Sequence, residues 1–298
     1  MTSPQHPRAI DHLVLPVVDI AVARERYEQI GFTVAPDGKH PFGTENCCIF
    51  FNDDTFLEPL GIAHRETCEA AALKGNTFIA NDQAYRFRRS VEGFSHLVIR
   101  SNDASEDAKN YRAQAISGGR SVRFSRKFAL PDGSRDKASF SLAFAADNRA
   151  PDAGFFACEV VHAPHVDRTA LKSHANGAMR LLEVVIAEPN PSDFQYFLQS
   201  FLGQRHMDNH SFGIEFETDN AKVSVLSPDG MRAFYGATTE PDERGMRFEA
   251  FVVGVESLVH VEALLGERGI AANRIGPRLV LPKAPGQGTL IAFQEISA

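Results

Sequence analysis

The fold of this chain is decided by the stretch AIDHLVLPV at residues 9–17, which returns in altered form as GFSHLVIR at residues 93–100. Both stretches predict short buried strands, because in each of them the fourth residue is a histidine and an apolar run follows it. Residues alternate faces along a strand, so His12 and His96 point away from the leucine that follows each of them. A repeated strand with a histidine on one face predicts a functional site there.

The two strands open copies of a larger unit. The segment 19–30 has apolar residues at helical spacing and is followed by Gly31, after which extended apolar segments resume. The same order of strand, helix and three further strands begins again near residues 93, 178 and 245. Four copies of one βαβββ unit therefore predict an α+β fold built by duplication.

Length and charge narrow the function classes. A chain of 298 residues exceeds the usual span of one hydrophobic core, and a polar segment at 162–177 separates its halves. We therefore expect one domain over residues 1–165 and a second over residues 166–298. The net charge of -7 argues against a nucleic-acid partner, because no basic excess can neutralise phosphates. No apolar run could span a membrane and no signal-type segment opens the chain, so we expect a cytoplasmic protein.

The histidines and glutamates of the first two units show a family resemblance. A histidine in the first strand and a glutamate in the last strand of two successive βαβββ units resemble the vicinal oxygen chelate superfamily. The segment HPFGTEN at residues 40–46 further resembles its glyoxalase-like branch. The resemblance implies that the four units pair into two cup-shaped domains of mixed β-sheet with helices on the outside. It also implies a metal ion on the concave face of the first cup.

Carried onto this sequence, the resemblance gives four metal ligands. They are His12 and Glu58 in the first unit, and His96 and Glu159 in the second. Two imidazoles and two carboxylates suit one divalent ion but do not choose among Zn, Ni, Fe, Mn and Co. A glutamate within an apolar strand is costly to bury alone, and a metal would relieve that cost in both units. A hydrated glutamate beside a core histidine would explain either unit alone, whereas the matched pair favours the metal.

The second half of the chain lacks this set. Glu183 and Ala250 stand where the first strands of the first two units have histidine, and the last strands carry apolar or small residues. A metal needs several convergent ligands, so one glutamate does not suffice. We expect residues 166–298 to keep the fold with a degenerate site.

Polar and basic residues of the first half are candidates for substrate binding. They lie on predicted loops, from which they could reach an anionic substrate: His40, Asn46, Arg126 and Arg135. As ordinary surface charge they would need no function, and the sequence does not decide between the two interpretations.

The resemblance implies a metal-dependent enzyme of the lyase or isomerase class. The metal would bind a small substrate through two neighbouring oxygens and stabilise the enediolate or enolate that forms when a proton is removed next to a carbonyl. Glu159 or Glu58 would be the catalytic base, and the family analogy favours Glu159. Whether the first unit pairs with the second inside one chain or across a homodimer stays open.

Two other functions stay open. One is a non-haem Fe(II) dioxygenase of the extradiol type, with His12, His96 and Glu159 as ligands. Its ligands would then lie in the first half of the chain rather than the second, and Glu58 would fill a position that oxygen needs. The other is a metal-free protein that binds or sequesters a small molecule, against which the filled ligand set argues.

Overall fold

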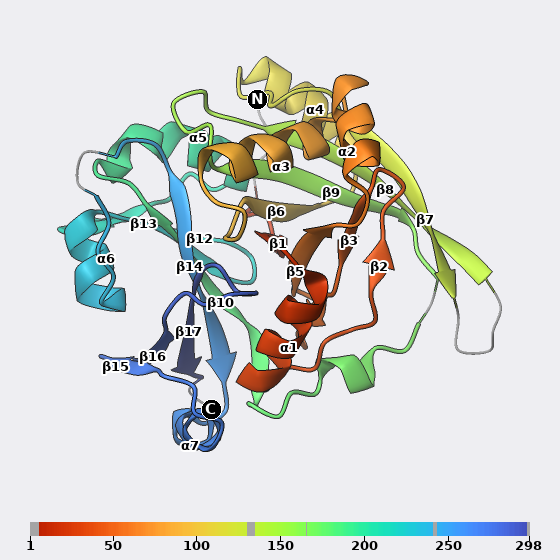
Figure 1. Ribbon diagram of the computed structural model, residues 1–298. Helices are drawn as coiled ribbons and strands as arrows, with labels where there is room; N and C mark the ends of the chain where they lie inside the picture. Colours follow the sequence, from red (N-terminus) through yellow and green to blue (C-terminus); the bar gives the residue numbers. More distant parts are fainter. Residues whose placement is uncertain (1–5, 130–134, 165, 241–242, 297–298) are drawn as a thin grey trace.

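The structure is a computed structural model that describes residues 6–129, 135–164, 166–240 and 243–296. Within these residues the expected βαβββ unit, called a module below, occurs four times. Figure 1 shows the resulting sheets with the helices outside them, which confirms the predicted α+β fold. The first module consists of β1 (Ile10–Pro16), α1 (Ile20–Ile30), β2 (Gly38–Lys39), β3 (Thr44–Asn46), β4 (Ile49–Phe50) and β5 (Phe56–Ile62).

The other modules follow in the same order, with some added helices. Two helices, α2 (Arg65–Leu73) and α3 (Thr77–Arg88), connect the first module to the second. The second module has β6 (His96–Ser101), α4 (Ala104–Ala113), β7 (Val122–Ala129), β8 (Arg135–Ala145) and β9 (Gly154–His162). The third has β10 (Ala178–Ala187), α5 (Gln195–Leu202), β11 (Asp208–His210), β12 (Gly213–Glu217) and β13 (Lys222–Leu226). The fourth, after α6 (Pro228–Tyr235), has β14 (Arg247–Val255), α7 (Leu258–Glu267), β15 (Asn273–Ile275), β16 (Arg278–Leu281) and β17 (Leu290–Glu295).

The first two modules form one mixed sheet. Its strands lie in the order β2-β3-β5-β1-β6-β9-β8-β7, with β4 paired to β5 beside this path. The central strands β1 and β6 are antiparallel, and each is parallel to the last strand of its own module. The first two modules therefore pair within one chain. The other two modules repeat this arrangement in a second sheet around β10 and β14.

One hydrophobic core joins the two sheets. The outer faces of their central strands pack with α1, α4, α5 and α7 in a single cluster that contains residues of both halves. Leu13 and Leu97 contribute from the first sheet, and Phe251 and Phe293 from the second. No helix in the described part of the chain is long and apolar enough to cross a membrane.

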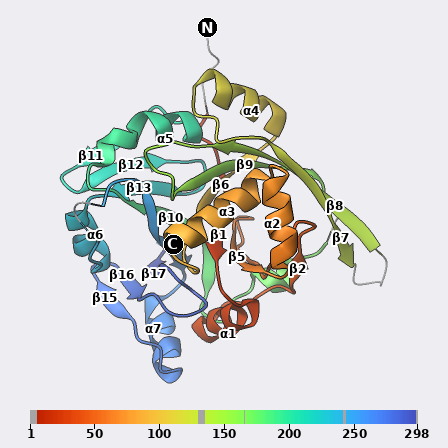
Figure 2. The same cartoon turned by 45° about the horizontal axis from the view of Figure 1, so that its top comes forward.

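Different helices cover the two inner faces. In Figure 2, α2 and α3 lie over the first sheet, where Cys68 and Phe78 pack in one cluster with Val14. The helix α6 places Met231 and Tyr235 on the inner face of the second sheet. Each inner face therefore has its own small apolar cluster, separate from the core between the sheets.

Local sequence directs the chain from β1 to the outer face. The Asp19 side chain accepts hydrogen bonds from the backbone N–H groups of Ala21 and Val22, which satisfies two donors at the start of α1. Gly31 follows the helix with a φ of 100°, a left-handed conformation that favours glycine. Because α1 packs on the outer face, the inner face of β1 remains available for a site.

The strand register shows what replaces the histidine of β1 in the second half. Glu183 begins the parallel pairing of β10 with β13, as His12 begins that of β1 with β5. Ser224, two residues along β13, has the place that Glu58 has in β5. The buried Glu183 carboxylate accepts hydrogen bonds from Ser224 and Arg278. An internal ion pair therefore occupies this position in the second half.

His96 lies on the inner face of β6 but is enclosed by its neighbours. Its side chain is buried, its Nδ1 lies 2.8 Å from the Ser95 hydroxyl, and its ring contacts those of Phe78 and Phe156. Gly154 lies opposite His96 on β9 and leaves room for the ring. A Cβ at Gly154 would lie 2.1 Å from His96 Cδ2, closer than packing allows.

Replacing Gly154 by alanine should therefore destabilise the fold. We expect Gly154→Ala to lower the free energy of unfolding by about 1–3 kcal/mol, because the ring or the strand must move. Urea unfolding measures this change. In the control Gly266→Ala the new Cβ meets nothing within 4 Å in α7, and we expect a gain of about 0.5–1 kcal/mol. If both variants gained stability, the packing of His96 against Gly154 would be refuted.

Candidate functional site

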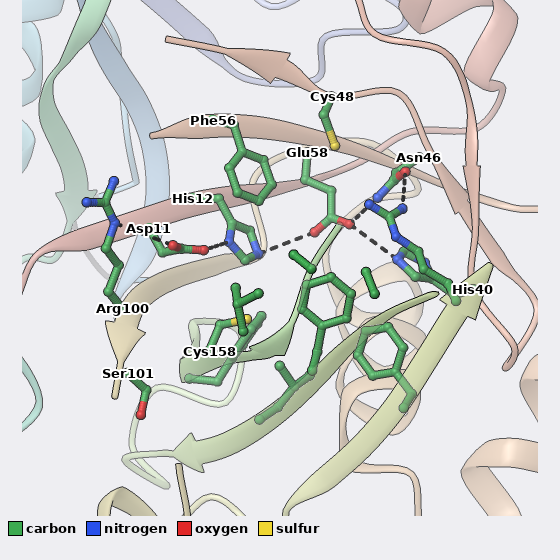
Figure 3. Close-up of a pocket in the computed structure, with 18 of the residues that line it drawn as sticks. Asp11, His12, His40, Asn46, Cys48, Phe56, Glu58, Arg100, Ser101 and Cys158 are labelled. Atoms are coloured by element: carbon green, nitrogen blue, oxygen red, sulfur yellow. Dashed lines mark hydrogen bonds and ion pairs between the residues drawn. The ribbon is translucent and has the colours of Figure 1, made fainter. Parts of the chain in front are cut away.

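A pocket of about 470 Å³ opens on the inner face of the first sheet. Figure 3 shows polar side chains entering it from several strands and meeting among aromatic rings. The phenylalanines that line the pocket are Phe42, Phe50, Phe56, Phe78, Phe124, Phe140 and Phe156. Most of the wall is thus apolar, and the polar groups around Glu58 form one compact cluster.

Glu58 is the carboxylate at the centre of this cluster. Its place in β5, two residues after Phe56, turns the side chain to the inner face, where it is only 7% exposed. Its Oε1 accepts a hydrogen bond of 2.6 Å from the Asn46 amide. Its Oε2 lies 3.4 Å from His12 Nε2, and its Oε1 lies 3.7 Å from His40 Nε2. Three polar side chains therefore surround one buried carboxylate.

A β-bulge brings Asp11 to the same cluster. The pairing of β1 with β6 shifts between Ile10 and His12, so Asp11 is an extra residue in β1. A bulge changes the direction of a side chain, and here the Asp11 carboxylate lies 2.6 Å from His12 Nδ1. Arg100 of β6 holds Asp11 in turn, with its Nε 3.5 Å from the carboxylate and its terminal nitrogen donating to the Asp53 carbonyl.

These contacts make His12 and Glu58 an ion pair. Burial lowers the pKa of His12, but hydrogen bonds to Asp11 and Glu58 outweigh burial and raise this pKa to about 9. Burial likewise raises the pKa of Glu58, but the hydrogen bond and charge of His12 outweigh it and lower this pKa to about 2. At neutral pH the imidazolium and the carboxylate are therefore both charged.

The other side of the cluster is built on β2, β3 and β7. His40 Nδ1 lies 2.9 Å from the Thr44 hydroxyl, and burial lowers the pKa of His40 to about 4, so its ring is neutral. The Asn46 amide oxygen accepts a hydrogen bond of 3.4 Å from Arg126. Gly38 permits this packing, because a Cβ there would lie 2.2 Å from an Arg126 nitrogen and 2.5 Å from the Asn46 oxygen.

The structure brings together two of the four predicted metal ligands. His12 and Glu58 face each other in the pocket, whereas His96 is enclosed behind the pocket wall. Glu159 turns to the opposite face of β9, where its carboxylate accepts a hydrogen bond of 3.0 Å from the backbone N–H of Ala104 at the start of α4. Glu159 is therefore not part of the pocket.

The register of β9 explains the position of Glu159. Phe156 lies two residues after the start of the pairing between β6 and β9, the place that Glu58 has in β5. Glu159 lies three residues further along, on the other face of the strand. Among the described residues, no three side chains of histidine, cysteine, aspartate or glutamate are placed to hold a metal ion. The predicted four-ligand centre does not fit this arrangement.

Three of the four predicted substrate-binding residues line the pocket. They are His40, Asn46 and Arg126. The fourth, Arg135, begins β8, but its side chain lies outside the described part of the structure.

Sequence reasoning missed the residues that support the cluster. Asp11 stands directly before His12, but alternation along a strand places it on the opposite face, and the bulge is not visible in the sequence. Arg100 and Arg168 line the pocket as well and had no motif to mark them. In the sequence, the phenylalanines of the pocket cannot be distinguished from ordinary core residues. Only the tertiary structure shows that they surround one cavity.

Comparisons with known proteins agree with this architecture. The family model described as a glyoxalase-like domain matches residues 10–202. No curated protein matches the chain. A hypothetical protein from Staphylococcus aureus is structurally similar with a TM-score of 0.65 and 10% identity, over 97% of this chain and 99% of that one.

Two further solved structures share the fold. A mutant of 4-hydroxymandelate synthase from Streptomyces coelicolor has a TM-score of 0.60 and 12% identity, over 97% of this chain and 93% of that one. The Mn(II)-bound glyoxalase from Novosphingobium aromaticivorans has a TM-score of 0.52 and 10% identity, over 97% and 82% respectively. At these identities the likeness concerns the fold alone.

The ion pair predicts a particular dependence of stability on pH. An unfolded His12 titrates near 6.5 and an unfolded Glu58 near 4.5, so the pair stabilises the fold most between these values. Stability from His12 is lost as pH rises from 6.5 through about 9, and stability from Glu58 as pH falls from 4.5 through about 2. As pH rises from 6.5 to about 9, we expect the free energy of unfolding of wild type to fall by about 3 kcal/mol relative to that of His12→Gln. Urea unfolding at a series of pH values measures this change. The exposed His64→Gln is the control, and a difference that does not change with pH would contradict the pairing.

Asp11 should control the charge of His12. In Asp11→Asn the imidazole loses a carboxylate partner, so we expect the pKa of His12 to fall below the wild-type value of about 9. A titration of histidine side chains by NMR measures this shift. Asp19→Asn, which changes only the cap of α1, should leave the His12 titration where it is. An unchanged His12 pKa in Asp11→Asn would show that the bulge does not couple the two residues.

Proposed function

Because this chain belongs to the family of glyoxalase-like domains, within the vicinal oxygen chelate superfamily, we propose that it is a lyase or isomerase that removes a proton next to a carbonyl group. The observation that carries the proposal is the charged pair of Glu58 and His12 in a pocket walled by phenylalanines. Such a site offers a base and a cation to one small substrate among apolar side chains.

Glu58 is the proposed base. Its carboxylate is ionised and held by neighbours on both oxygens, so it has a fixed direction. It takes the proton from the carbon next to the carbonyl, and the electron pair of that C–H bond moves to give an enolate. The proton then returns to a neighbouring atom in an isomerisation, or a leaving group departs with the electron pair in a lyase reaction.

His12 is the proposed stabiliser of the enolate oxygen. Its Nδ1 proton is held by Asp11, so Nε2 is the nitrogen that presents a proton to the pocket. When the carbonyl oxygen of the bound substrate, which becomes the enolate oxygen, takes over this hydrogen bond, Glu58 loses its ion-pair partner and its pKa rises. A carboxylate that is a weak base in the free protein then becomes a stronger one at the step that needs it. His12 thus takes the charge-stabilising role that the family resemblance implied for a metal.

The test is exchange of hydrogen with solvent. Wild type in D2O should replace the proton next to the carbonyl group of small ketones. Proton NMR follows this exchange over a panel with aliphatic side chains, aromatic side chains, and aromatic side chains that carry a carboxylate. We expect Glu58→Gln to slow the catalysed exchange by about a hundredfold or more, because the base is lost. Glu45→Gln on the neighbouring strand β3 is the matched control and should exchange at the wild-type rate.

Two outcomes would contradict the proposal. One is exchange by Glu58→Gln at the wild-type rate, which would exclude this residue as the base. The other is wild-type exchange no faster than in buffer for any member of the panel. The second outcome, together with tight binding of a panel member, would instead support a small-molecule-binding protein. A small-molecule-binding protein is the alternative function, because the hydrogen bond and the ion pair of Glu58 already satisfy its carboxylate when no reaction takes place.

A further inference from the structure

Three arginines line the pocket, and they differ in what their side chains contact. Arg100 binds Asp11 and the Asp53 carbonyl, and Arg126 donates to Asn46. The guanidinium of Arg168 instead lies over an aromatic ring that also lines the pocket, with its Cζ 4.6 Å from the ring centroid of Phe50. Within the described ranges no carboxylate lies at ion-pair distance from Arg168. Its N–H groups are therefore available to a ligand.

Arg168 belongs to the segment that connects the two halves of the chain. Ala163 and Pro164 of this segment also line the pocket, so the connection forms part of the pocket wall. It is held in place further along, where Lys172 forms an ion pair of 2.5 Å with Asp54 in the turn after β4. His174 then lies 2.9 Å from the Phe50 carbonyl. These contacts hold the segment beside β4, where Arg168 covers the Phe50 ring.

The wall between the polar cluster and this segment is aromatic. His12 stacks on Phe56 with ring centroids 4.4 Å apart, and Phe56 contacts Phe50 at 5.4 Å. On the facing side, Phe124 contacts Phe140 at 5.1 Å. Flat rings pack well against such surfaces, in offset or edge-to-face geometry. A guanidinium in partly apolar surroundings also binds a carboxylate more strongly than it would in water.

We infer that the pocket takes an aromatic carboxylate, with the ring between the phenylalanines and the carboxylate on Arg168. This inference rests on the proposed function, which places the reacting carbonyl group of the substrate at His12 and Glu58. It adds that the rest of the substrate is an aromatic ring that carries a carboxylate. It gives the connecting segment a role in substrate selection. Arg168 is a specificity residue here and takes no part in the proton transfer.

Binding of simple probes tests this inference without any turnover. Isothermal titration with 3-phenylpropanoate, 3-phenylpropan-1-ol and butanoate separates the charge from the ring. We expect wild type to bind 3-phenylpropanoate most tightly, and Arg168→Gln to bind it about ten- to hundredfold more weakly. The alcohol should bind both proteins alike, and Arg168→Lys should recover part of the loss. Arg205→Gln, at an exposed position in the second half, should behave as wild type.

The outcomes distinguish this inference from the proposed function. Equal binding of 3-phenylpropanoate by wild type and Arg168→Gln would overturn the role of Arg168. Wild type that binds butanoate as tightly as 3-phenylpropanoate, or binds neither up to their solubility, would overturn the aromatic class. Glu58→Gln should still bind the aromatic acid. Binding that depends on Arg168 in a wild type without exchange activity would leave this inference standing and remove only the proposed reaction.

Discussion

The site depends on one constraint, which is that the carboxylate of Glu58 is buried among aromatic rings. An ionised carboxylate in such a place requires a partner with opposite charge and further hydrogen bonds. His12 supplies the charge and Asn46 the hydrogen bond. Each of these is held by another residue, with Asp11 behind His12 and Arg126 behind Asn46. The positions of β1, β3, β5 and β7 are thus linked through a single buried charge.

The second half of the molecule shows a different solution to the same constraint. Glu183 occupies in β10 the place of His12 in β1, and it is buried as deeply. There the charge is neutralised by Arg278, while α6 brings Tyr235 onto the inner face. In the first half, the imidazole and carboxylate side chains face an open pocket instead. The same fold position therefore holds an enclosed ion pair in the second half and an ion pair that faces a pocket in the first.

The two halves are not independent in the structure. Their outer faces share one core, and the segment that connects them forms part of the pocket wall. Lys172 and His174 hold that segment against the turn after β4 and the end of β4 itself. Packing between the halves therefore acts on the shape of the pocket, although the groups of the central cluster all come from the first half.

The sequence by itself determined the repeating order of strands and helices and the residue types at the centre of the site. Hydrophobic periodicity marked β1 and β6, and the position of Glu58 within an apolar strand marked it as a residue that needs a partner. Tertiary structure alone decided the rest. Side chains alternate along a strand, so Glu159, three residues beyond Phe156, lies on the outer face, whereas Phe156 lies in the pocket. The bulge at Asp11 has the opposite effect, because it adds a carboxylate that strict alternation would have turned away.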